Sequence, residues 1–334
     1  MKNIDKILNS IGNYLYIRSY GNLGDLLIAE ATEQYFAQKG YDYQIVKPDA
    51  VIEQNHTLVH GGGARFTADW CDVDTCIRVL CNEKVEKCVI LPSSFHEVDE
   101  LVKHFDARHT IFCRDARSYE YCCSMCPDSQ VYLTDDMAVH LNLNDMVPTG
   151  LDESANGEEE IRLQEALRVY LYRWMQRGMR RASVTSCIGG TKRRVAFLMR
   201  TDKEKRAAWS SPMSYDISLI WHAPSKNKYN ANLLLAMSNA LRMSDVIVSD
   251  RLHVCIMAYL SGLEVYMVDN TYGKLKGVYE QSLSACPRVH LVQSHFMPPE
   301  LQKAWKKMNA VTRRLFYWGE DTCRTLLKRV MRRK

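Results

Sequence analysis

Short apolar runs typical of strands alternate with helical patterns over two stretches of this 334-residue chain. The first stretch spans residues 14–145, and the second resumes at residue 194. Repeated strand–helix–strand alternation predicts a parallel sheet covered by helices. Because the length exceeds what one hydrophobic core usually serves, we expect two domains. The pattern therefore predicts an α/β fold with two doubly wound, Rossmann-like domains facing a cleft.

A polar segment separates the two stretches. Residues 145–160 combine Pro, Gly and a run of acids, which is typical of a connecting loop, and a basic helix is expected over residues 161–181. Residues 184–191 are expected to form a second loop. The expected units are an N-terminal domain (1–145), a linker with its basic helix (146–190), a C-terminal domain (191–300) and basic amphipathic helices (301–334).

The expected strands occupy residues 14–20, 43–46, 56–60, 87–91, 110–113, 130–133, 195–199, 245–249, 264–268 and 289–292. The expected helices occupy residues 1–12, 26–39, 98–105, 116–125, 161–181, 231–242, 254–261 and 274–283. Ligands of open parallel sheets bind beyond the carboxyl ends of the strands. The loops that directly follow the strands are therefore the places to look for chemistry.

Basic charge is concentrated at the C-terminus. The formal net charge is +5, and residues 301–334 hold eleven of the 44 Lys and Arg residues but only two of the 39 Asp and Glu residues. Apolar side chains interleave with these bases, which predicts amphipathic helix. Such a helix either packs on the N-terminal domain with a solvated basic face or docks on an anionic membrane surface. Nucleic acid is not expected as a partner, because the aromatic residues of the basic helix over residues 161–181 fall on its apolar stripe.

No apolar run is long enough to cross a membrane, and the first twelve residues lack the apolar stretch of a signal peptide. We therefore expect a cytoplasmic protein, peripheral at the inner face of the membrane if its tail binds lipid. Twelve cysteines would then remain reduced. Cys123 and Cys126 form a C-x-x-C pair, but no second pair follows at zinc-site spacing, so neither a metal nor another cofactor is expected.

Two glycine-containing loops follow strands in the first stretch. In the first, Asn22, Gly24 and Asp25 open a helix, whose free N–H groups can meet an anion or sugar hydroxyls; Asp25 as a plain helix cap is the alternative. In the second, Gly61, Gly62 and Gly63 would let a ligand lie against the backbone, or form a flexible turn.

Charged residues end two later strands of the same stretch. Arg114 closes one strand, and Asp135 and Asp136 close the next. Both positions lie on the side where a cleft is expected. For the two aspartates, capping of the following helical turn is the alternative role.

The second stretch carries the densest cluster of polar residues at a strand end. Arg200 closes one strand, and the next ends in Ser249-Asp250-Arg251-Leu252-His253. Arginine binds carboxylate or phosphate, and histidine moves protons near neutral pH. Asp250 is expected to orient its neighbours. At the next strand end, Asn270 and Lys274 offer polar groups to the same rim, and a plain surface lysine is the alternative role of Lys274.

Taken in order, these loops resemble the polysaccharide pyruvyl transferase family. The matching segments are residues 20–28 (YGNLGDLLI), 60–66 (HGGGARF), 91–94 (LPSS), 114–118 (RDARS), 135–136, Arg200, 249–253 (SDRLH) and 269–274. The segment 249–253 is the most specific of them. The long basic segment over residues 145–190 departs from the family pattern.

The resemblance implies a glycosyltransferase-B-like fold and an enzyme that moves pyruvate from phosphoenolpyruvate onto two hydroxyls of a hexose, releasing phosphate. By the same resemblance, Arg200, Arg251, Leu252, His253, Asn270 and Lys274 bind the donor. His253, Arg251 and Asp250 are implied as catalytic. Asn22, Gly24, Asp25, Gly61, Gly62, Gly63, Arg114 and Asp135 are expected on the acceptor side.

The resemblance further implies, as acceptor, a hexose with a 4,6-diol such as galactose, in a polyprenyl-diphosphate-linked precursor of an exopolysaccharide or capsule. A glycosyltransferase of the same architecture that uses a nucleotide sugar is the main alternative, since a basic site between two Rossmann-like domains suits a diphosphate equally well. The oligomeric state is not predicted.

Overall fold

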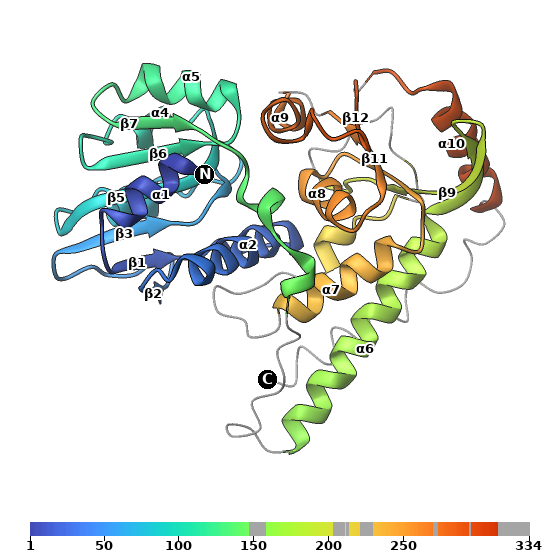
Figure 1. The fold of residues 1–334 in the computed structure, drawn as a ribbon, viewed down its shortest axis with the longest axis horizontal. Coiled ribbons are helices and arrows are strands. Elements are labelled where there is room, and N and C mark those ends of the chain that lie inside the picture. The colour runs from blue at the N-terminus through green and yellow to red at the C-terminus, as the bar shows by residue number, and fades with distance from the viewer. Residues whose placement is uncertain are drawn as a thin grey trace.

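The computed structural model describes residues 1–146, 158–202, 211, 214–220, 230–269, 273–293 and 295–312, without the side chains of residues 158–168, 230, 274, 311 and 312. Two sheets lie side by side, and helices fill the space between them (Figure 1). We call them the first sheet and the second sheet. The predicted α/β class is confirmed, whereas a division into two domains of glycosyltransferase-B type stays a prediction.

The first sheet has seven strands in the order β2-β1-β3-β5-β6-β7, with β4 paired to β5, and every pairing is parallel. Its strands are β1 (Tyr14–Ile17), β2 (Tyr43–Val46), β3 (His56–His60), β4 (Gly63–Thr67), β5 (Val85–His96), β6 (His109–Cys113) and β7 (Gln130–Leu133). Its helices are α1 (Lys2–Asn9), α2 (Leu23–Lys39), α3 (Val73–Leu80), α4 (Asp99–Val102), α5 (Ala116–Met125) and the 3₁₀ turns η1 (Met137–His140) and η2 (Leu143–Asp145).

The path of the chain places a switch point in this sheet. From β1 it moves to β2 on one side and then returns to β3 on the other. Right-handed crossovers therefore put α2 on one face and α3, α4 and α5 on the opposite face. Successive side chains of β1 point to opposite faces, which agrees with this placement of the helices. Tyr16 is buried in the apolar cluster that includes α2, and Ile17 is buried in the cluster that includes α3 to α5. The loops after β1 and β3 diverge at this point, where such sheets bind ligands.

The second sheet has five strands in the order β12-β11-β10-β9-β8, with β8 antiparallel and the others parallel. Its strands are β8 (Ser183–Ile188), β9 (Thr191–Leu198), β10 (Val246–Ser249), β11 (Glu264–Val268) and β12 (Val289–Val292). Its helices are α6 (Glu158–Arg181), η4 (Ile217–Ile220), α7 (Asn230–Leu241), α8 (Leu252–Leu260), α9 (Lys274–Val278), the π-helical η5 (Tyr279–Leu283) and α10 (Pro299–Thr312).

From β9 to β12, each strand lies next to the preceding one on the same side. Right-handed crossovers therefore place α7, α8 and α9 on one face of the second sheet. That face turns toward the first sheet. The opposite face is covered by α10, where the Trp305 ring meets Phe197 edge-on at 4.9 Å between centroids. The single winding of this sheet differs from the doubly wound arrangement expected.

One buried apolar cluster joins the two sheets. Leu27 of α2, Leu234 of α7 and Ile256 of α8 belong to the same cluster, and each is at most 1% exposed. The cluster also holds Met175 and Met179 of α6, so the basic helix is packed against the core rather than projecting as a free linker. The two sheets are therefore held together by burial of apolar surface, the dominant favourable term in folding.

The expected loop over residues 184–191 is wrong. Residues 183–198 form a hairpin of β8 and β9, turned by Gly189 and Gly190 with φ of +55° and +79°. Two successive positive φ values are what a tight hairpin turn of this twist requires, and glycine adopts them without strain. β4 and α3 were also not anticipated. Most of the expected connecting loop over residues 145–160 lies outside the described residues, which exclude 147–157.

The C-terminal basic segment begins on the second sheet. Leu301, Ala304 and Met308 of α10 are buried against it, and Lys307 Nζ donates to the Thr185 carbonyl at 2.8 Å. Packing on the N-terminal domain is therefore wrong for residues 301–312, while residues 313–334 lie outside the described part. Within the described residues, no helix is long and apolar enough to cross a membrane.

The shared core predicts that both sheets unfold in one transition. Leu234→Ala should lower the free energy of unfolding by about 2–5 kcal/mol, because it leaves a cavity in the cluster that joins them. Urea titrations followed by far-ultraviolet circular dichroism and by tryptophan fluorescence should shift together. The exposed Val51→Ala is the control and should change little. Two separate transitions, only one of which shifts, would contradict the prediction.

Candidate active site

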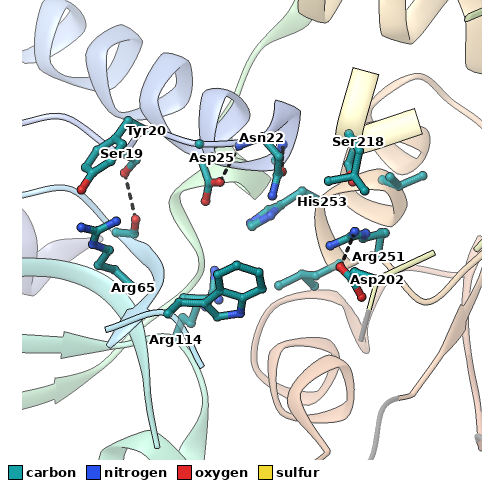
Figure 2. A pocket seen from close by; sticks show the side chains of 18 of the residues that line it. Ser19, Tyr20, Asn22, Asp25, Arg65, Arg114, Asp202, Ser218, Arg251 and His253 are labelled. Carbon is teal, nitrogen blue, oxygen red and sulfur yellow. Dashed lines mark hydrogen bonds and ion pairs between the residues drawn. The ribbon is translucent and has the colours of Figure 1, made fainter. Parts of the chain in front are cut away.

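A pocket of about 280 Å³ lies where the switch-point loops of the first sheet meet the start of α8 (Figure 2). His253 stands between Asn22 and Asp25 on one side and Arg251 and Asp202 on the other. The predicted site residues that line the pocket are Asn22, Gly24, Asp25, Gly62, Arg114, Arg200, Arg251, Leu252 and His253. The structure thus brings residues from both halves of the chain into one cavity.

A capping box shapes the wall formed by α2. The Asn22 side chain accepts from the Gly24 N–H at 2.7 Å, and the Asp25 carboxylate accepts from the Asn22 N–H at 2.9 Å. This arrangement satisfies two of the unpaired N–H groups at the start of a helix. Asn22 is therefore the cap, and Asp25 is the third residue of the helix. Both side chains also line the pocket, so the capping role and the pocket role coexist.

Gly24 allows α2 and α8 to touch at the pocket. A Cβ atom at Gly24 would lie 2.6 Å from His253 Nδ1 and 2.9 Å from His253 Cβ, which is closer than real Cβ contacts. The imidazole therefore packs directly on the backbone of the opposite helix. This contact fixes the position of His253 relative to the first sheet.

Backbone crowding accounts for the consecutive glycines after β3. A Cβ atom at Gly61 would lie 2.7 Å from the Ser19 nitrogen, and one at Gly62 would lie 2.4 Å from the Pro92 carbonyl oxygen. Ser19 Oγ also donates to the Gly62 carbonyl at 2.8 Å. These glycines hold the switch-point loops against each other. Gly62 lines the pocket, whereas Gly61 and Gly63 do not.

A buried carboxylate links His253 to the first sheet. Asp136 follows β7 and is fully buried; its Oδ2 lies 3.5 Å from His253 Nε2 and accepts from Arg114 Nη1 at 2.6 Å. Its Oδ1 accepts from the Ala138 N–H at 2.9 Å and caps η1. Burial alone would raise the pKa of Asp136, but Arg114 and His253 outweigh it and hold that pKa well below its usual range. The residue is therefore a carboxylate that faces the imidazole.

The two arginines of the second sheet are paired with carboxylates. Arg200 donates from Nε and Nη2 to Asp202 at 3.0 and 3.1 Å. Arg251 donates from Nη2 to Asp202 at 2.6 Å and from Nε to Asp216 at 3.1 Å. Asp202 lines the pocket and so occupies guanidinium groups that an incoming anion would use. Sequence reasoning missed both aspartates, because neither directly follows a strand.

Asp250 lies behind this pair rather than in the pocket. It is 1% exposed, and its Oδ1 accepts from the Arg200 N–H at 2.8 Å. Burial raises its pKa to about 6, although the Arg200 N–H and the charges of Arg200 and Arg251 pull it down. Asp250 does not line the pocket, and both its orienting role and its implied catalytic role stay predictions.

The remaining predicted residues lie elsewhere or cannot be placed. Asp135 does not line the pocket; its carboxylate lies 3.3 Å from His140 Nε2 and accepts from Gln281 at 3.4 Å. Its neighbour Asp136 is the residue that reaches the site. Asn270 and the side chain of Lys274 lie outside the described residues.

Several pocket residues were not among the predicted set. The Arg65 guanidinium lies over the Tyr20 ring at 4.6 Å, and Trp70 is 48% exposed at the same wall. His60 is buried, which lowers its pKa to about 4, so its imidazole is neutral at neutral pH. Arg65 was within reach of sequence reasoning, since it comes two residues after the glycines. Within the described part of the chain, no cluster of three or more His, Cys, Asp or Glu residues could hold a metal ion.

Asp250 generates a pH-dependent prediction. Its folded-state pKa lies above the unfolded value of 3.8, so the native state loses stability as the pH rises from 4 through 6. Asp250→Asn cannot ionise and can still accept from Arg200. Relative to wild type, its free energy of unfolding should therefore rise by up to about 3 kcal/mol between pH 4 and pH 7. Urea unfolding at each pH measures this, with the exposed Asp49→Asn as control; a constant difference would refute the shift.

Comparison with known proteins places these motifs in a family. The family model for polysaccharide pyruvyl transferase matches residues 22–272, a span that runs from the cap of α2 past the end of β11. No curated protein matches the chain.

Two solved structures were compared. An uncharacterised protein from Klebsiella pneumoniae subsp. pneumoniae superimposes with a TM-score of 0.65 at 24% identity, covering 87% of this chain and 97% of that one, which shows a shared fold. A variant of SsGBP covers 92% of this chain and 100% of its own at 11% identity, but its TM-score of 0.21 carries no structural likeness. Because the family model matches most of its length, the chain belongs to the polysaccharide pyruvyl transferase family and is a transferase.

Proposed function

We propose that this enzyme transfers pyruvate from phosphoenolpyruvate to two hydroxyls of one hexose, which forms a cyclic ketal and releases phosphate. The observation that supports it best is the position of His253, which lies between the α2 wall and the arginines of the second sheet, with Asp136 3.5 Å from its Nε2. Its imidazole, the proposed proton-transferring group, thus lies between a wall rich in hydrogen-bonding groups and a wall with two guanidinium groups.

The proton balance of the reaction explains why such a group is needed. Two C–O bonds form at the central donor carbon, and its bond to the phosphate oxygen breaks. Of the two protons that leave the hydroxyls, one ends on the former methylene carbon and the other leaves with phosphate. His253 is proposed to carry protons between these atoms as general acid and base. The Asp136 carboxylate would stabilise the imidazolium form.

The size of the pocket suits a small donor together with one sugar. Its volume of about 280 Å³ is just below the range typical of ligand pockets. Arg251 and Arg200 would hold the phosphate, which requires that their contacts with Asp202 loosen. Asn22 and Asp25 would bind acceptor hydroxyls, and the exposed face of Trp70 would pack on the sugar ring. We further propose a galactose 4,6-diol in a polyprenyl-diphosphate-linked precursor of an exopolysaccharide or capsule, reached at the inner face of the membrane. No metal or other cofactor is invoked.

A donor screen tests the proposal. The enzyme is incubated with galactose-terminated, lipid-linked oligosaccharides and either phosphoenolpyruvate or UDP-hexoses, and products are identified by mass. Phosphate release with a pyruvylated product is expected from phosphoenolpyruvate. Nucleotide release from a UDP-hexose would instead establish a glycosyltransferase.

His253→Ala should lower kcat by about 10²–10⁴-fold, because it removes the proposed acid and base. Phosphate release from phosphoenolpyruvate in the presence of acceptor is the measurement. His56→Ala, at an exposed histidine on β3, is the matched control and should retain wild-type kcat. Turnover by the His253 variant within a few-fold of wild type would exclude the assigned role.

Gly24→Ala should lower kcat by about 100-fold while the helix still forms, because the new Cβ must push the imidazole out of place. Gly40→Ala at the other end of α2 is the control. That position has φ of +68° and open space around it, so the change strains the helix end without touching the site. A Gly24 variant with unchanged kcat would show that the contact with His253 does not matter.

A further inference from the structure

Arg114 is the most completely buried charged side chain at the pocket. It ends β6, is 0% exposed, and contributes to the pocket lining. Nε donates to Ser94 Oγ at 2.9 Å and Nη1 donates to Asp136 at 2.6 Å, so the plane of the guanidinium is fixed. Ser94 is held in turn, since its hydroxyl donates to Asp115 at 2.8 Å.

The third nitrogen of the Arg114 guanidinium, Nη2, is buried and has no hydrogen-bond partner among the described residues. A buried donor on a charged group without a partner is destabilising, and native proteins seldom retain one. An acceptor that arrives with a ligand would complete this site.

We propose that Arg114 Nη2 binds the carboxylate of the donor, rather than the acceptor sugar. This inference rests on the proposed function and specifies how the donor is oriented. Arg114 and His253 both contact Asp136 Oδ2, at 2.6 and 3.5 Å, so the guanidinium lies next to the imidazole that would act on the central donor carbon. In the donor, that carbon carries the carboxylate directly.

Charge and hydrogen-bonding capacity together assign the two anionic ends of the donor to the two walls. The phosphate carries the larger charge and takes the second sheet's wall, where two guanidinium groups and the start of α8 meet once Asp202 has loosened its contacts with both arginines. At the first sheet's wall, the Asp136 carboxylate already takes one hydrogen of Arg114 and would repel a dianion more than a monoanion. The singly charged carboxylate is therefore the end that Arg114 accommodates.

Arg114→Lys tests this assignment. Lysine keeps a positive charge for Asp136 but lacks the second arm of the guanidinium. Binding to the full-length chain is measured calorimetrically with phosphoenolpyruvate, pyruvate and inorganic phosphate in turn. We expect pyruvate and phosphoenolpyruvate to bind about 10–100-fold more weakly to the variant, as for loss of one charge-assisted hydrogen bond, and inorganic phosphate to bind within about twofold of wild type. The exposed Arg117→Lys on α5 is the control.

Pyruvate, which carries only the carboxylate, and inorganic phosphate together distinguish a binding role of Arg114 from a structural one. A merely structural role would weaken both or neither, and either result would overturn the proposal, as would failure of pyruvate to bind wild type at millimolar concentration. If Arg114→Lys does not fold, Arg114→Gln with Asp136→Asn removes both buried charges and should show the same selective loss. If wild type binds pyruvate in an Arg114-dependent way but not phosphoenolpyruvate, the carboxylate subsite stands and the proposed donor is wrong.

Discussion

The contact between the Asp136 carboxylate, the Arg114 guanidinium and the His253 imidazole is the interaction on which the site depends. Asp136 and Arg114 end adjacent strands of the first sheet, whereas His253 belongs to the first turn of α8 in the second half of the chain. A buried ion pair is costly unless its geometry is good and its remaining groups are satisfied. Here the Asp136 carboxylate faces His253 Nε2 at 3.5 Å on one side, and the missing side chain of Gly24 leaves room for the imidazole on the other. Neither half of the chain could hold His253 in this position alone.

Much of this site was predictable, because strand ends in a parallel sheet converge. The loops after β1, β3, β6, β9 and β10 all reach the pocket, as the alternation of strands and helices implied. The choice of Asp135 over Asp136 could not be made from sequence, since both follow the same strand and only the direction of each side chain separates them. The pairing of the two arginines with Asp202 and Asp216 depends on the fold of segments that carry no regular pattern.

The missed elements have physical causes as well. β4 begins at the third of three glycines, which predict a turn, and pairs with β5 only because β5 runs on to His96. β8 is short and polar on one face, and its hairpin partner supplies the hydrogen bonds that its sequence does not predict. Conversely, β3, β7, β11 and β12 match their predicted bounds, because short runs rich in apolar residues between polar loops mark strands well.

The apolar cluster shared by α2, α7 and α8 has a consequence for how substrates enter. Enzymes built from two loosely linked lobes admit ligands by a hinge motion that parts the lobes. Such a motion here would expose the side chains that join the two sheets to water, at a cost that grows with every square ångström of apolar surface uncovered. Ligand exchange is then left to side chains that line the pocket, such as Asp202, whose contacts with Arg200 and Arg251 can change without separating the two sheets.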